Sequence, residues 1–220
     1  MNELIDNIAG VVLAGGRGSR MGPEPKVLIR LGGQTLLERA VLHAAPQVSC
    51  LLISSNLSAA DLGNPTQPVL PDTVPGYLGP LAGVCAALEH LQQHEPQALW
   101  LCSFAADTPW FPLDLVARLD TAIRAGDARL AVARSGGRSH PVFALWPMSI
   151  LPEIRAALSA PTELGAGRFQ SRFPVAFADW PCAAEEDPFF NLNTPEDFAR
   201  ARSRVARDEG AGGSARKPLP

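Results

Sequence analysis

A glycine-rich segment near the N-terminus combines residue types that hold phosphate groups. It reads GVVLAGGRGSRMGPEPK over residues 10–26, so an apolar run is followed by closely spaced glycines and basic residues. Glycines let backbone N–H groups approach an anion, and neighbouring cations offset its charge. We therefore expect a phosphate-binding loop formed by Gly15, Gly16 and Gly18, with Arg20 and Lys26 as its cations.

The segment fits neither of two common nucleotide-binding patterns. A P-loop requires a Gly-Lys pair, and here Pro23 follows Gly22. A Rossmann fingerprint requires a third glycine where Met21 stands, and an acid near the end of the second strand, where the chain has Asn56. The surplus of cations favours the three linked phosphates of a nucleoside triphosphate over a single pyrophosphate. The alternative that the residues leave open is an exposed turn whose arginines are hydrated.

A second feature is a carboxylate at the end of an apolar run. The stretch LWLCSFAADTPWFP, residues 99–112, reaches Asp107 and is then broken by prolines. Because ligands of open α/β sheets bind at the carboxyl ends of strands, Asp107 should face the glycine-rich segment. A triphosphate travels with Mg²⁺, which prefers carboxylate, water and phosphate oxygens, so Asp107 is the candidate metal ligand. Its alternative role is to cap the following turn.

Two further groups of polar residues are candidates for the same site. Asn191 and Asn193 alternate in FFNLNTPED, so both side chains can position phosphate or metal-bound water, or the pair simply begins a helix. Arg134, Arg138 and His140 surround the glycine turn of RSGGRSHPV. These basic residues are candidates to grip an anionic second substrate, and the alternative is a solvated hairpin tip.

A run of small residues follows Asp72. It reads TVPGYLGPLAG, ends at Gly83 and continues into a helical stretch without a charge until Glu89. Small residues at the start of a helix allow a ligand to approach the backbone closely. Tight packing of the helix on a sheet explains them equally well.

Apolar runs of strand length alternate with amphipathic helical stretches, which predicts a mostly parallel α/β sheet covered by helices on both faces. The expected strands are IAGVVLA, SCLLISS, PVLP, LWLCSF, RLAVAR, HPVFALW and PVAFADW. The expected helices cover residues 35–45, 79–93, 112–125, 149–159 and 195–208. Gly136-Gly137 predicts a hairpin that returns one antiparallel strand to the sheet. We expect one domain over residues 1–208 and a disordered tail over residues 209–220.

Composition disfavours several classes of protein. The 220 residues carry a formal net charge of −3, which disfavours a nucleic-acid polymer as the ligand. The N-terminus lacks the basic start of a secretory signal, and the longest uncharged stretch contains polar residues and a proline. We therefore expect a cytoplasmic protein without a membrane span. The four cysteines show no CxxC pairing, and three of them are expected to be small buried thiols.

The ordered motifs resemble those of the small nucleotidyltransferases related to molybdenum cofactor guanylyltransferase. The resemblance covers Gly10 to Arg200, and its motifs are LAGGRGSRMG…K, ISSN, PD…PGYLGPLAG, DTPWFP, HPVFALW and NLNTPEDFA. The chain departs from the family pattern at Pro25, where an acid is common, and at Ala105-Ala106, where a cysteine or proline usually precedes the aspartate. LAGG resembles the guanylyltransferases more than the related cytidylyltransferases, which usually read LAAG.

The resemblance implies a Rossmann-like three-layer αβα fold of the nucleotide-diphospho-sugar transferase type. It implies transfer of GMP from GTP to the terminal phosphate of molybdopterin or molybdenum-molybdopterin, with release of pyrophosphate and Mg²⁺ as cofactor. It implies roles in catalysis for Arg20, Lys26 and Asp107, and it favours a place in the site for Asn191 and Asn193. The resemblance implies guanine nucleotide contacts for Leu13, Ala14, Gly15, Lys26, Asn56 and Asp72. We expect Gly16, Gly18, Gly83 and Asp107 to belong to the nucleotide site as well. Transient contact with cofactor-insertion enzymes and molybdoenzyme chaperones is also implied.

Three alternatives remain open from the sequence. One is another small-metabolite nucleotidyltransferase, such as a cytidylyltransferase, which would use the same loop and metal. Another is an NAD(P)-dependent oxidoreductase with an irregular loop, which Asn56 in place of an acid disfavours. The third is a nucleotide-binding module without catalysis, which Asp107 and the asparagine pair disfavour.

Overall fold

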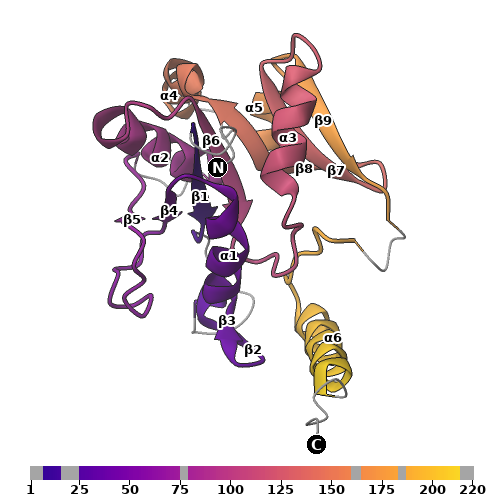
Figure 1. Ribbon diagram of the computed structural model, residues 1–220. Helices are drawn as coiled ribbons and strands as arrows, with labels where there is room; N and C mark the ends of the chain where they lie inside the picture. Colours follow the sequence, from indigo (N-terminus) through magenta and orange to yellow (C-terminus); the bar gives the residue numbers. More distant parts are fainter. Residues whose placement is uncertain (1–6, 16–24, 75–78, 160–164, 183–186, 214–220) are drawn as a thin grey trace, which may run out of the picture.

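The computed structural model describes residues 7–15, 25–74, 79–159, 165–182 and 187–213, with side chains up to residue 206 (Figure 1). Its centre is a seven-stranded sheet with the strand order β5-β4-β1-β6-β8-β7-β9. The strands are β1 (Ile8–Leu13), β4 (Leu51–Ser54), β5 (Val69–Leu70), β6 (Trp100–Ala105), β7 (Leu130–Ser135), β8 (Arg138–Pro147) and β9 (Val175–Trp180). Strand β8 is antiparallel to both of its neighbours, and the other pairs are parallel. The mostly parallel α/β sheet predicted from the sequence is confirmed.

Helices cover both faces of this sheet, which gives three layers (Figure 1). One face packs against α1 (Leu36–Ala44) and α3 (Leu115–Arg124). The other packs against α2 (Pro80–His94), α4 (Leu151–Leu158) and α5 (Ala166–Gln170). Successive residues of β1 explain the two faces, because Ile8 and Val12 join the first core cluster while Ala9 and Val11 join the second. A strand that is covered on both sides needs the continuous apolar run that this sequence has.

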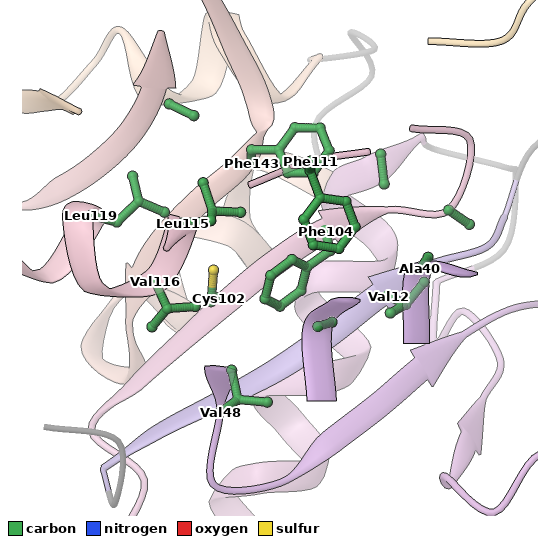
Figure 2. Close-up of a cluster of buried hydrophobic side chains, with 14 of the residues drawn as sticks. Val12, Ala40, Val48, Cys102, Phe104, Phe111, Leu115, Val116, Leu119 and Phe143 are labelled. Carbon is green, nitrogen blue, oxygen red and sulfur yellow. The ribbon is translucent and has the colours of Figure 1, made fainter. Parts of the chain in front are cut away.

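Aromatic side chains form the centre of the core under α1 and α3 (Figure 2). The ring of Phe111 lies 5.2 Å from that of Phe104 on β6 and 5.5 Å from that of Phe143 on β8, measured between centroids. All three side chains are buried. Phe111 belongs to the segment that follows Asp107, so this core fixes that segment to the sheet.

The start of α1 is stabilised by a capping box. Thr35 Oγ1 accepts the Glu38 N–H at 3.1 Å, and Glu38 Oε2 accepts the Thr35 N–H at 2.7 Å. Each contact satisfies a backbone donor that the helix itself leaves without a partner.

The predicted hairpin joins β7 to β8. Gly136 and Gly137 form its turn with φ angles of 52° and 80°. Both values lie in the left-handed region, which glycine adopts without a steric cost and which a two-residue hairpin turn requires. The Gly-Gly pair therefore returns β8 beside β7 as the one antiparallel strand of the large sheet in the described residues.

The structure differs from the sequence prediction at its shortest elements and at its C-terminal end. Strands β2 (Arg30–Leu31) and β3 (Gln34–Thr35) form a separate ribbon, and neither this ribbon nor α5 was predicted. Helix α6 (Pro195–Gly213) extends beyond residue 208, where the predicted helix ends. The tail expected over residues 209–220 stays a prediction. Residues 214–220 lie outside the described residues.

Helix α6 packs away from the two helical layers that cover the sheet (Figure 1). Its apolar side chains form a small core of their own with the β2–β3 ribbon and the first residue of α1. The buried members are Leu31, Leu36, Leu192, Phe198, Ala201 and Val205. The amphipathic pattern predicted the helix but not this location.

Two expectations from composition can be compared with the described residues. All four cysteines are free, and two of the three expected buried thiols, Cys85 and Cys102, are buried, whereas Cys50 is only partly buried. Among the described helices, none combines the length and the apolar character needed to cross a bilayer.

Candidate active site

The parallel strands of the sheet end at one edge, and several predicted site residues follow those ends. Leu13 of β1 lies opposite Ala105 of β6, and the Ala106 N–H donates to the Leu13 carbonyl at 3.2 Å. Gly15 and Asp107 therefore leave the sheet beside each other. The expectation that Asp107 lies next to the start of the glycine-rich segment is met by the described residues.

Lys26, Asp107 and Asn193 meet at this edge. Lys26 Nζ donates to Asp107 Oδ2 at 2.7 Å and to Asn193 Oδ1 at 2.6 Å. The Lys26 side chain is 16% exposed and that of Asp107 is 29% exposed, so the pair is shielded from bulk water but can still be reached by a ligand. The sequence predicted all three residues, and the structure brings them together.

Lys26 is positioned by a short 3-10 helix, η1 (Lys26–Leu28). Pro25 precedes it with a φ of −57°, and the Pro25 carbonyl accepts the Leu28 N–H at 2.9 Å. The Val27 side chain is buried in the core beneath α1. Pro25 therefore starts the turn that presents Lys26, although an acid is common at this position in the family that the sequence resembles.

Asn193 is positioned by the segment that contains it. The Leu192 N–H donates to the Asp107 carbonyl at 3.0 Å, and the Leu192 side chain is fully buried in the core beside α6. Asn191, on the other side of Leu192, accepts a hydrogen bond from Thr108 Oγ1 through its Oδ1. Asn191 thus contacts the residue after Asp107, while Asn193 contacts the cation paired with Asp107.

The alternative role of Asn193, at the start of a helix, also holds. Asp197 Oδ2 accepts the N–H groups of Asn193 and Thr194, both at 2.9 Å, and Thr194 Oγ1 accepts the Asp197 N–H at 3.2 Å. Burial acts to raise the pKa of Asp197, but these hydrogen bonds outweigh it and lower that pKa. The backbone of Asn193 begins α6 while its side chain holds Lys26.

Asn56 and Asp72 form a second polar pair at the same edge, beyond the ends of β4 and β5. Asn56 Nδ2 donates to Asp72 Oδ2 at 2.8 Å, and the Asp72 N–H donates to Asn56 Oδ1 at 2.9 Å. Strand β4 pairs directly with β1, so this pair lies on the β4 side of Gly15. A carboxylate here can accept N–H donors of a nucleobase.

Gly83 is explained by packing. It is buried in α2, and a Cβ at this position would lie 2.7 Å from Leu13 Cδ2 and would also overlap Ser54. Of the two explanations for the small residues at the start of α2, the structure supports close packing of this helix on the sheet. A Cβ at Gly83 would point at β1 and β4, so packing alone accounts for the glycine, and the nucleotide contact predicted for it stays a prediction.

Two of the predicted second-substrate residues are held by the protein itself. Arg134 forms a two-pronged ion pair with Asp179, with N–O distances of 2.6 and 2.7 Å, and lies over the Phe177 ring. His140 is buried, and its Nε2 lies 2.6 Å from Ser135 Oγ. Burial lowers the pKa of His140, and the Asp187 carboxylate opposes this effect.

Arg138 differs from these two residues because it is exposed at the start of β8. The hairpin tip lies at the same edge of the sheet as Asp107, since β7 runs in the same direction as β6. Arg138 has no ion-pair partner in the described residues, whereas the Arg134 side chain is 37% exposed but already paired with Asp179.

The remaining members of the glycine-rich segment are only partly described. Gly16, Gly18 and Arg20 lie outside the described residues, so their roles stay predictions. The Ala14 N–H donates to the Ser54 carbonyl at 2.9 Å and is used by the sheet. Gly15 is exposed and is the first residue beyond the sheet whose backbone can approach a phosphate.

The structure adds residues that the sequence did not single out. Thr108 contacts Asn191, and Ser135, Asp187 and Phe189 surround His140. Serine, threonine and phenylalanine at such positions carry no sequence signal of their own. Thr108 directly follows Asp107, the predicted metal ligand, and this adjacency is the one signal that could have found it.

The oxygen atoms at this edge suit a magnesium ion. Asp107 offers a carboxylate, and Asn191 and Asn193 offer amide oxygens. Within the ranges that the structure covers, no three His, Cys, Asp or Glu side chains gather into a metal-binding group. Nucleotide-bound Mg²⁺ commonly takes one or two carboxylates and completes its shell with phosphate and water, so a single aspartate fits.

Residues 10–172 match the family described as MobA-like NTP transferase domain. The chain belongs to this family. It is 44% identical over 198 residues to the molybdenum cofactor guanylyltransferase of Rhodopseudomonas palustris strain HaA2, covering 90% of this chain and 92% of the relative. It is 42% identical over 202 residues to the protein of the same name from Bradyrhizobium sp. strain ORS 278, covering 92% and 95%. Membership of this family makes the chain a nucleotidyltransferase.

Solved structures show the MobA-like fold in more distant proteins. A molybdopterin-guanine dinucleotide biosynthesis protein A from Archaeoglobus fulgidus has a TM-score of 0.72 at 22% identity, covering 90% of this chain and 99% of its own. A 4-diphosphocytidyl-2C-methyl-D-erythritolsynthase from Anaerococcus prevotii has a TM-score of 0.69 at 13% identity, covering 94% and 100%. The predicted three-layer nucleotidyltransferase fold is confirmed.

Proposed function

We propose that this MobA-like chain transfers GMP from GTP to the terminal phosphate of molybdopterin, with Mg²⁺ held at Asp107, and releases pyrophosphate. The observation that carries the proposal is the cluster of Lys26, Asp107 and Asn193 beside Gly15 at the carboxyl edge of the sheet. The names of relatives at 42–44% identity support GTP and molybdopterin as the substrates.

The reaction needs no proton to be removed from its nucleophile. A phosphate monoester has its second pKa at about 6, so most of it is doubly charged at neutral pH. One of its oxygens attacks the α-phosphorus of GTP. The bond from that phosphorus to the oxygen bridging the β-phosphate breaks, and pyrophosphate leaves with the bonding electrons. The main obstacle is the repulsion between two polyanions, which positive charge and backbone N–H groups reduce.

Lys26 supplies this charge in a fixed position. Asp107 and Asn193 hold its ammonium group by two short hydrogen bonds, so little reorganisation is required when a phosphate approaches. The exposed backbone of Gly15 adds a donor at the end of β1. Asp107 would hold the metal ion through its second carboxylate oxygen, since Oδ2 accepts from Lys26, and Asn191 and Asn193 would position phosphate or metal-bound water. The ion would neutralise phosphate charge and orient the triphosphate.

We assign the second substrate to the hairpin side of this edge. Arg138 is exposed there, and Asn191 lies between the hairpin and Asp107. Arg134 is paired with Asp179 and His140 is buried, so Arg138 is the first choice for this contact, and substrate contacts of the other two stay predictions. The contacts with cofactor-insertion enzymes and chaperones stay predictions.

A nucleotide panel tests the proposed function. We expect pyrophosphate release from GTP, with molybdopterin and Mg²⁺ present, to be much faster than release from CTP or ATP. We also expect GTP with Mg²⁺ to raise the melting temperature more than the other two nucleotides. Faster release from CTP would make the chain a cytidylyltransferase, and no release from any nucleotide would overturn the proposal.

A further inference from the structure

The segment over residues 187–193 is attached to the protein at both of its ends. At one end, Leu192 is buried beside α6 and bonded to the Asp107 carbonyl, and the Phe190 ring lies 4.5 Å from the Arg200 guanidinium. The other end reaches the β7–β8 hairpin through Asp187 and Phe189. Asn191 lies between the two attachments and Asn193 directly follows Leu192, so the positions of both asparagines depend on how this segment is attached.

A chain of hydrogen bonds makes the attachment at the hairpin. Asp187 Oδ1 accepts the hydroxyl proton of Ser135 at 2.7 Å and the Phe189 N–H at 2.9 Å. Ser135 Oγ lies 2.6 Å from His140 Nε2. An ionised carboxylate can only accept, so the hydroxyl proton points to Asp187 and the oxygen lone pair faces the ring. His140 therefore carries a proton on Nε2 and donates it to Ser135.

Aromatic packing reinforces these hydrogen bonds. The Phe189 ring stacks on the His140 ring with centroids 4.6 Å apart, and it also contacts Phe143 at 4.9 Å and Trp180 at 5.2 Å. Phe189 is 2% exposed and Ser135 is 3% exposed. A buried polar chain of this kind costs stability when one member is lost, because the others are left without partners.

The direction of the hydrogen bonds excludes a nucleophilic role for Ser135. In a Ser-His-Asp triad the histidine accepts the serine proton and the aspartate orients the histidine. Here the serine donates to the aspartate and accepts from the histidine, and its oxygen is buried. These hydrogen bonds are therefore suited to fix the segment that contains Asp187 to the hairpin.

We propose that Ser135, His140 and Asp187 are positioning residues, a hairpin latch that sets Asn191 and Asn193 against Lys26 and Asp107. This inference rests on the proposed function for its effect on turnover, although the latch itself is a statement about the segment over residues 187–193. The latch also connects the hairpin that carries Arg138 to Lys26, the cation bonded to Asp107.

Two substitutions at Asp187 separate positioning from charge. Asp187→Asn keeps an oxygen that can accept from Ser135 and Phe189, so we expect kcat within about twofold of the wild type. Asp187→Ala removes both contacts, and we expect kcat to fall about tenfold because small displacements of positioned groups have effects of this size or larger. The KM for GTP should change little, since Asn56 and Asp72 lie on the other side of Gly15.

Ser135→Ala should resemble Asp187→Ala, because it removes the hydroxyl that Asp187 accepts from. Ser139→Ala, on the exposed part of the same hairpin, is the control.

Hydrogen exchange of the segment over residues 187–193 gives a readout that does not require turnover. We expect faster exchange in Ser135→Ala and Asp187→Ala, and wild-type exchange in Asp187→Asn and Ser139→Ala. If Asp187→Ala does not fold, Ser135→Ala carries the comparison. Unchanged exchange in Ser135→Ala would overturn the latch, and so would an Asp187→Asn variant as inactive as Asp187→Ala. A wild-type protein without GMP transfer would instead overturn the proposed function, while the exchange experiment would still decide on the latch.

Discussion

At the scale of single residues, the site depends on one cation shared by two oxygen acceptors. Lys26 Nζ is bonded to both Asp107 and Asn193, which come from segments far apart in the sequence. A charge held in this way is preorganised for a phosphate, since its partners are already in place before the substrate arrives. Removing one acceptor should therefore affect turnover more than it affects folding.

Asp107→Asn tests this expectation. The amide oxygen can still accept from Lys26 Nζ, so we expect the melting temperature to change little. We expect kcat to fall by at least about 10²-fold, because the carboxylate charge that would hold the metal is lost. Pyrophosphate release at saturating GTP and Mg²⁺ measures the effect, with Asp127→Asn on the exposed surface as the matched control. A rate near that of the wild type would contradict the role of Asp107.

His140 should make stability depend on pH. Burial lowers the pKa of His140, Asp187 opposes this effect, and Arg138 adds to it. The folded chain therefore binds this proton at a lower pH than the unfolded chain does. The unfolded histidine titrates at about pH 6.5, so the free energy of unfolding should fall as the pH drops below that value. We expect the free energy of unfolding, measured in denaturant at several pH values between 7 and 5, to fall less steeply with decreasing pH in His140→Gln than in the wild type. Equal slopes in the two proteins would show that His140 does not contribute.

At the scale of the elements, the carboxyl ends of the parallel strands bring the site residues together. Strands β1, β4 and β6 were predictable because their apolar runs are continuous, and Gly136-Gly137 marked the hairpin. Asp107 could be predicted from its place at the end of an apolar strand, and Lys26 from its place beside the glycine-rich segment. For Asn193 the resemblance to a known family was needed. The latch could not be predicted, because Ser135 and Asp187 have no motif and meet only through the tertiary fold. The β2–β3 ribbon and α5 were missed because such short elements carry little periodicity.

Gly83→Ala tests the packing of α2 on the sheet. Alanine normally favours a helix over glycine by up to about 1 kcal/mol, but here its Cβ would overlap Leu13 and Ser54. We expect the overlap to dominate and to lower the free energy of unfolding by about 1–3 kcal/mol. Gly126→Ala is the control, because nothing lies within 4 Å of a Cβ built there. Increased stability of Gly83→Ala in denaturant would show that the helix has room to move.

At the scale of the whole molecule, α6 links the C-terminal part of the chain to the site. The core that it forms with the β2–β3 ribbon contains Leu192, which lies between the two asparagines. The sequence predicted an amphipathic helix here, but the pattern of apolar residues does not specify which surface the helix covers. Packing of α6 should therefore affect both stability and turnover.

Phe198→Ala tests this connection. Phe198 is 3% exposed in the core beside Leu192, and removal of a buried phenylalanine side chain typically costs about 3–5 kcal/mol. We expect a clear loss of stability in denaturant and a lower kcat, whereas Arg202→Ala on the exposed side of α6 should change neither. Full turnover in a destabilised Phe198→Ala protein would separate α6 from the site.

The most direct measurement is a crystal structure of the protein with GTP and Mg²⁺. We expect an Asp107 oxygen to coordinate the ion at about 2.1 Å and the triphosphate to lie against Gly15 and Lys26. A nucleotide bound at any other place, or an ion that does not touch Asp107, would contradict the assignment of this edge of the sheet as the active site.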